Sequence, residues 1–401
     1  MQNNICDVRG IKAWGAHMGI KSKRRDLALI YSEKPASAAA VFTKNLVCAE
    51  PVKLCRQHMK DGIIQAIVVN SGNANACTGK KGWEGAVAMA ETTAEVLGIP
   101  KESVMVASTG LIGEPFPTEK VVKGIRESAL KLSDRQLAGS LAANAILTTD
   151  TFAKEGYSSF DIDGIKINMA GIAKGSGMIH PDMATMLSFI VCDLAITPKL
   201  LDKALRTVAD KTFNMITVDG DTSTNDMVGI LCNGMAGNDI IDKEDQRYDL
   251  FLEQLEKLCI HLAMLIVSDG EGSTKLIEYR VEGAKNAEDA RKIIRTVSTS
   301  NLVKTAIFGT DPNWGRIFAA AGRAGVNFNP DNVDLYFGKN KGVQILRKGQ
   351  PTDHGRSDLK KEMHSSTVNI TLVLNEGDAE AVGWGSDLSY EYVRINAEYT
   401  T

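Results

Sequence analysis

Residues 174–190 read KGSGMIHPDMATMLSFI, a glycine-rich loop that leads directly into an apolar segment. Gly175 and Gly177 permit the tight backbone geometry of such a loop. The apolar residues 186–196 predict a largely buried strand. Thr185 stands at the junction, so the sequence places a hydroxyl between a strained loop and a rigid element.

This position suits self-cleavage by an N→O acyl shift. The hydroxyl of Thr185 would attack the carbonyl carbon of Ala184, and water would hydrolyse the resulting ester. Cleavage would leave an α-amino group on Thr185 with a pKa of about 7.7–8.0, so the residue would carry both a nucleophile and its base. A threonine that only caps a strand edge is the alternative, and the residues alone leave both open.

Composition excludes several classes of protein. A net charge of -3 gives no general attraction to nucleic acid or to anionic membranes, and the basic cluster Lys21–Arg25 is expected to be a solvated turn. No run approaches the roughly 20 apolar residues of a membrane span, and the N-terminus lacks a signal-peptide pattern. Seven scattered cysteines and six scattered histidines indicate reduced thiols and no metal site. We therefore expect a soluble, cytoplasmic protein.

Apolar runs alternate with amphipathic stretches, which predicts an α/β or α+β protein. Strands are expected at 63–70, 103–107, 186–196, 333–337 and 367–373. Helices are expected at 83–97, 198–211, 249–267, 288–297 and 317–324. The pattern of expected helices and strands changes near residue 280, so we predict a core domain over 1–280 and a smaller α+β domain over 281–401.

Six blocks of sequence resemble, in the same order, the ArgJ family, the glutamate N-acetyltransferases also called ornithine acetyltransferases. The blocks are VVNSGNANACTG (68–79), STGLIGEP (108–115), KGSGMIHPDMATML (174–187), TVDGDTSTND (217–226), SDGEGSTK (268–275) and DPNWGR (311–316). The third resembles the autoprocessing signature of that family. The resemblance implies an α/β fold of the ArgJ type, in which helices cover layers of β-sheet.

The resemblance also implies an activity. The chain would cut itself between Ala184 and Thr185 into an α chain (1–184) and a β chain (185–401), which would assemble as an α2β2 heterotetramer. Thr185 would take an acetyl group from N2-acetylornithine, release ornithine and pass the acetyl to glutamate, giving N-acetylglutamate for arginine biosynthesis. No cofactor is implied, because the acetyl-enzyme carries the group. Some members also use acetyl-CoA, and the sequence leaves that point open.

Two residues would stabilise the oxyanion. The resemblance implies that Thr109 offers its hydroxyl and Gly110 its backbone N–H, and a donor of this kind often contributes about 3–4 kcal/mol. An ordinary turn after a strand is the alternative.

Further residues would bind substrate. The resemblance implies contacts from Thr151, Lys174, Thr185, Glu271, Asn396 and Thr401. A lysine suits the carboxylate of an amino acid, and a glutamate suits its ammonium group. From composition alone, the lysine is more often a solvated charge, and the glutamate could equally be a helix-end acid. A frayed tail is the default expectation for the last two residues.

Some features depart from known patterns. The segment DGDTSTND lacks the glycine of a calcium loop, and GNANACTGKK lacks the spacing of a phosphate loop. Residues 14–18 are bulkier than the family resemblance implies, and Met215 stands where it implies an arginine.

Two rival functions stay open: an N-terminal-nucleophile amidase or aminopeptidase, and a catalytically silent relative that binds amino acids.

Overall fold

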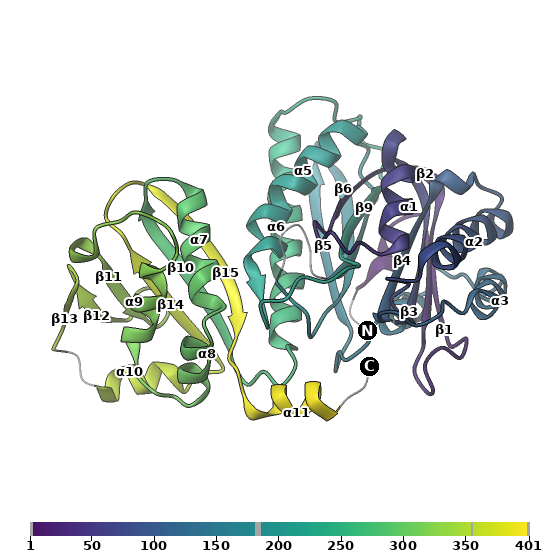
Figure 1. Cartoon of the computed structure of the whole chain (residues 1–401). Helices are drawn as coiled ribbons and strands as arrows, with labels where there is room; N and C mark the ends of the chain where they lie inside the picture. Colours follow the sequence, from purple (N-terminus) through teal and green to yellow (C-terminus); the bar gives the residue numbers. More distant parts are fainter. Residues whose placement is uncertain (1–2, 181–185, 354–355, 399–401) are drawn as a thin grey trace.

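The computed structural model describes residues 3–180, 186–353 and 356–398. The described residues form two β-sheets with helices packed against them (Figure 1). None of the helices in these ranges is long and apolar enough to cross a membrane. All seven cysteines are free thiols, as the sequence predicted.

The larger sheet has the strand order β4-β3-β2-β9-β7-β6-β5, and β1 pairs with β2. Its strands are β1 (Ile11–Ala16), β2 (Leu27–Phe42), β3 (Ile63–Asn73), β4 (Val104–Leu111), β5 (Lys154–Ile162), β6 (Ile165–Lys174), β7 (Leu187–Cys192) and β9 (Met227–Cys232). Every residue of β7 and β9 is buried, which is why these strands read as continuous apolar runs.

Helices cover both faces of this sheet. On one face pack α1 (Glu50–His58), α2 (Gly79–Leu97), α3 (Thr118–Ala129) and α4 (Gln136–Ala145); on the other pack α5 (Pro198–Lys211) and α6 (Gln246–Ser268). Strand β2 shows the alternation, because Ala38 and Ala40 enter the first core while Ala39 and Val41 enter the second. The layered α/β core expected from the sequence is therefore observed.

The smaller sheet has the order β13-β12-β11-β14-β10-β15-β8. Its strands are β8 (Ile216–Thr217), β10 (Leu276–Ala284), β11 (Asp334–Phe337), β12 (Val343–Arg347), β13 (Gln350–Pro351), β14 (Thr367–Val373) and β15 (Ala379–Ser386). Its helices are α7 (Ala287–Ser298), α8 (Asn301–Phe308), α9 (Trp314–Gly322) and α10 (Arg356–Met363). Residue 280 lies inside β10, the strand that follows α6, and β8 joins this sheet from the earlier part of the chain.

The last helix, α11 (Tyr390–Glu398), leaves the smaller sheet and returns to the larger one (Figure 1). The hydroxyl of Ser389 donates to the carbonyl of Gly272 over 2.6 Å, which holds the start of the helix beside the end of α6. The C-terminal segment is therefore brought to the rim of the larger sheet.

Candidate active site

A cavity of about 170 Å³ lies where β4 and β6 end and α11 returns. Five residues that the sequence predicted as site residues line it: Thr109, Gly110, Lys174, Glu271 and Asn396. They come from four of the distant segments singled out in the sequence. The fold therefore brings these predicted residues into one place.

Thr109 and Gly110 lie near the end of strand β4. Gly110 has a φ of 132°, and a Cβ there would lie 2.4 Å from the carbonyl carbon of Gly72 on β3. A side chain at this position would force the two strands apart, so the turn requires glycine. Asn225 supports the same strand end, because its Nδ2 donates to the carbonyl of Ser108 over 2.8 Å.

Lys174 ends strand β6 and points into the cavity with a relative exposure of 8%. Its Nζ donates to the hydroxyls of Thr148 over 2.9 Å and Thr109 over 3.3 Å. In the sheet it is paired with Leu187, the first residue of β7. The lysine is thus a largely buried cation beside the strand that begins two residues after Thr185, and not a solvated charge.

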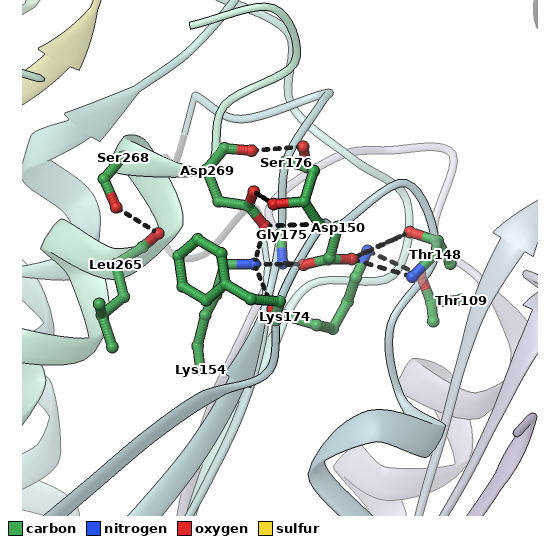
Figure 2. A network of polar contacts seen from close by, with 12 residues as sticks. Thr109, Thr148, Asp150, Lys154, Lys174, Gly175, Ser176, Leu265, Ser268 and Asp269 are labelled. Atoms are coloured by element: carbon green, nitrogen blue, oxygen red, sulfur yellow. Dashed lines mark hydrogen bonds and ion pairs between the residues drawn. The ribbon is translucent and has the colours of Figure 1, made fainter. Parts of the chain in front are cut away.

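A buried ion network holds this lysine in place, as Figure 2 shows. Nζ of Lys154 lies 2.7 Å from Asp150 and 2.6 Å from Asp269, and a carboxylate oxygen of Asp150 lies 3.9 Å from Nζ of Lys174. Burial alone would raise the pKa of Asp150, but the charges of the two lysines outweigh it and hold this pKa below its usual range. Asp150 also accepts the N–H of Gly175 over 2.7 Å, so the network fixes the start of the glycine-rich loop.

Sequence reasoning missed this network. Its members lie far apart in the chain and form no recognisable spacing, so only the fold reveals them. Thr148, which contacts Lys174 and lines the cavity, was missed for the same reason.

Thr151 takes a different position from the one expected. Its backbone N–H donates to the carboxylate of Asp269 over 3.0 Å, and its hydroxyl donates to the same carboxylate. Among the described residues that line the cavity are its neighbours Thr148 and Thr149, but not Thr151. The structure therefore places Thr151 in the supporting network.

Glu271 and Asn396 form the opposite wall. Nδ2 of Asn396 on α11 donates to Oε2 of Glu271 over 2.8 Å. The N–H of Glu271 donates to the carbonyl of Ser176 over 3.0 Å. A Cβ on Gly177 would lie 2.4 Å from a carboxylate oxygen of Glu271, so the second glycine of the loop is what lets this carboxylate approach.

The TVDGDTSTND block holds the glycine-rich loop through hydrogen bonds to its backbone. The carboxylate of Asp219 accepts the N–H groups of Met178, over 2.5 Å, and Ile179, over 2.9 Å. Burial raises the pKa of Asp219 despite these hydrogen bonds. Asp226 is 2% exposed, and burial raises its pKa well above the usual range. The block therefore orders backbone next to the cavity.

Three predicted site residues lie outside the described residues: Ala184, Thr185 and Thr401. The structure describes the chain on both sides of the predicted cleavage point, up to His180 and again from Met186. The N–H of Met227 on β9 donates to the carbonyl of Met186 over 2.9 Å, which fixes the downstream side.

Known proteins similar to this chain belong to the family that its six sequence blocks resemble. The model of the ArgJ family matches residues 12–401. A protein named arginine biosynthesis bifunctional protein ArgJ from Caldanaerobacter subterraneus is 50% identical over 98% of this chain and 97% of its own length. A protein of the same name from Listeria monocytogenes is 47% identical over 100% of this chain and 99% of its own.

A similar solved structure is that of an ornithine acetyltransferase from Mycobacterium tuberculosis, which is complexed with ornithine. It is 35% identical, covers 45% of this chain and 96% of its own, and has a TM-score of 0.41. The full-length sequence matches carry the assignment: the chain belongs to the ArgJ family. This confirms the family that the six sequence blocks predicted.

Proposed function

We propose that this chain is an acetyltransferase of arginine biosynthesis that moves an acetyl group from N2-acetylornithine to glutamate through an acetyl-Thr185 intermediate. One observation carries the proposal: a single cavity is lined by residues from distant family blocks, beside the strand that begins two residues after Thr185. Family membership supports it.

Recognition of the substrate rests on two opposite charges. Lys174 supplies a cation for the carboxylate of the bound amino acid, and Glu271 supplies an anion for its ammonium group. Both charges act at the wall of a small cavity, where screening by water is weaker than at the surface. Asn396 orients Glu271 through its amide. Thr401 completes the proposed set of substrate-binding residues, and Thr151 supports the set from the buried network through its hydrogen bond to Asp269.

The chemistry needs two acyl transfers. The hydroxyl of Thr185 attacks the acetyl carbonyl carbon, its proton passes to the α-amino group of the same residue, and the tetrahedral oxyanion is held by Thr109 and Gly110. The C–N bond then breaks, and the proton goes to the departing nitrogen of ornithine. In the second half, the amine of glutamate attacks the ester, the C–O bond breaks, and the displaced threonine oxygen recovers a proton.

The free α-amino group must first be made. We propose cleavage between Ala184 and Thr185 into the chains 1–184 and 185–401, assembled as an α2β2 heterotetramer in the cytoplasm. The contacts of Asp219 to Met178 and Ile179 support this step, because they fix the backbone that leads into the cleavage segment. We further propose that acetyl-CoA serves as a second donor.

One experiment separates the candidate functions. The purified protein is given N2-acetylornithine with and without glutamate, and the released ornithine is measured. An acetyltransferase releases ornithine much faster with glutamate, whereas an amidase or aminopeptidase releases it at the same rate because water is its acceptor. If no ornithine is released and no acetyl-enzyme forms, the chain is a silent relative.

A further inference from the structure

The chain enters the predicted cleavage segment through His180, where the described residues stop before they resume at Met186. Both ring nitrogens of this histidine have a partner. Nε2 lies 3.0 Å from a guanidinium nitrogen of Arg295, and Nδ1 lies 3.1 Å from the hydroxyl oxygen of Thr217. The hydroxyl of Thr222 donates to the backbone carbonyl of His180 over 2.9 Å, so the main chain is held as well as the ring.

The two partners fix the position of the ring proton. A guanidinium nitrogen of Arg295 can only donate, so Nε2 accepts. The single hydroxyl proton of Thr217 goes to the carbonyl of Ile179 over 3.1 Å, so Nδ1 must donate to the oxygen of that hydroxyl. His180 is therefore a neutral imidazole with its proton on Nδ1, and it bridges one donor and one acceptor.

Both of these partners belong to the smaller sheet. Thr217 lies in β8, which pairs with β15, and Arg295 lies in α7, which packs against β10 and β15. The buried Lys304 on α8 fastens the same region, because its Nζ donates to the carbonyl of Val218 over 2.7 Å and to that of Ser386. The smaller sheet therefore holds the upstream end of the predicted cleavage segment.

The larger sheet holds the downstream end. The N–H of Met227 on β9 donates to the carbonyl of Met186, and Leu187 begins β7, which lies between β6 and β9. A short segment thus connects two points that are fixed by different sheets. An acyl shift needs the attacking oxygen and the carbonyl carbon in a near-attack geometry, so the relative position of the two sheets bears directly on self-cleavage.

We propose that Arg295 is a positioning residue for self-cleavage. Through His180 it fixes the upstream end of the segment to the smaller sheet, so the chain cuts itself only when both sheets have formed and packed together. Arg295 exchanges no proton in the acyl shift. This inference rests on the proposed function and extends it to a part of the chain that does not line the cavity of the candidate active site.

The kinetics of self-cleavage test this proposal. The full-length chain is made by cell-free synthesis, synthesis is stopped, and the uncut fraction is followed over time on a denaturing gel. Arg295→Met removes the donor and is expected to cleave about tenfold more slowly than wild type. Lys292→Met is the matched control, because Lys292 is exposed on the same helix and pairs with Glu288. The control should cleave at the wild-type rate.

Two substitutions of the histidine separate positioning from a general loss of packing. Glutamine presents an amide oxygen near the position of Nε2 and can still accept from Arg295, whereas asparagine reaches only the position of Nδ1. We expect His180→Gln to cleave within about twofold of wild type and His180→Asn about tenfold more slowly. Because His180→Asn and Arg295→Met remove the same hydrogen bond, their combination should slow cleavage little further. Wild-type cleavage by His180→Asn, or additive effects in the double variant, would overturn the proposal.

Nitrogen-15 NMR of the histidine rings reports the tautomer itself. In the wild-type protein, His180 should show a neutral ring with its proton on Nδ1, and the absence of its signals from His180→Gln assigns them. A proton on Nε2 in wild type would reverse the direction of the contact with Arg295 and overturn the proposal.

The wild-type sample separates this inference from the proposed function. A wild-type chain that stays uncut would overturn self-cleavage and, with it, both proposals. A wild-type chain that is cut, together with Arg295→Met and His180→Asn chains cut at the same rate, would overturn the inference alone and leave the proposed function standing. If Arg295→Met does not fold, the two histidine variants decide the question.

Discussion

At the scale of single residues, the cavity depends on two glycines and one buried acid. Gly110 lets β3 and β4 close on each other, and Gly177 lets the carboxylate of Glu271 approach the loop. Asp150 joins Lys154 and Lys174 and also holds the N–H of Gly175. Each of these residues places neighbouring groups around the cavity, so single substitutions at them test how the cavity is built.

A methyl group on Gly177 should displace Glu271. We expect Gly177→Ala to raise the KM for N2-acetylornithine about tenfold, since the added Cβ would overlap the carboxylate that is proposed to hold the ammonium group. Steady-state kinetics measure this. Gly322→Ala is the control, because nothing lies within 4 Å of a Cβ placed there. An unchanged KM in both variants would remove Glu271 from the substrate site.

The ionised carboxylate of Asp150 should stabilise the folded chain, and this contribution should be lost at low pH. The pKa of Asp150 is lower in the folded chain than its ordinary value of about 3.9, so its contribution is complete above that pH and is lost as the pH falls toward the folded value. Asp150→Asn should cost roughly 3–5 kcal/mol at neutral pH, because it leaves buried lysines short of a counter-charge.

The measurement is thermal unfolding as a function of pH. The higher melting temperature of wild type over Asp150→Asn should disappear as the pH falls below about 4. A difference in melting temperature between the two proteins that stays constant across the whole acid range would show that folding does not lower the pKa of this carboxylate.

At the scale of elements, the sequence predicted regular structure well where local signals were strong. Helix α5 was predicted with both ends, since Pro198 at its first position is preorganised for a helix. Gly98, in the left-handed region with a φ of 66°, ends α2 as expected. The strand predicted at 186–196 ends early, at Cys192, because the buried carboxylate of Asp193 turns to accept both the N–H and the amide of Asn168.

Contacts between elements could not be predicted in this way. The ion network needs Asp150 and Asp269 side by side, 119 positions apart in the chain, and no periodicity encodes that. Family resemblance supplied the residues of the cavity wall, whereas the physical patterns alone favoured a solvated charge at Lys174 and left the role of Glu271 open. The fold is what turns those charges inward.

The loop before the cleavage point should depend on Asp219. Removing its carboxylate frees the N–H groups of Met178 and Ile179, so we expect Asp219→Ala to slow self-cleavage about tenfold or more. The fraction of uncut chain on a denaturing gel over time measures this. Asp221→Ala, which removes an exposed acid two residues away, is the matched control and should be cleaved at the wild-type rate. Equal rates in all three proteins would refute the role of this contact.

At the scale of the whole molecule, the strand order makes the two proposed chains inseparable. Strands β7 and β9 belong to the chain 185–401, yet they lie between β2 and β6 of the chain 1–184. The first chain would therefore have a sheet with its centre missing. The two chains should remain one cooperative unit after cleavage, because neither can bury its apolar strands alone.

Denaturant titration tests this directly. The cleaved protein should unfold in a single transition, with both chains released together, when fluorescence and size are followed in parallel. The uncut variant Thr185→Ala should show the same single transition. Release of one chain before the loss of tertiary structure would contradict the shared sheet.

The central claim is that Thr185 cuts its own chain and then carries the acetyl group. Intact mass spectrometry of the purified protein, before and after addition of N2-acetylornithine without glutamate, tests it most directly, with Thr185→Ala alongside. We predict two chains, one ending at Ala184 and one beginning at Thr185, and a gain of one acetyl group on the second chain only. A single uncut chain in the wild-type sample, or acetylation that persists in Thr185→Ala, would contradict the mechanism.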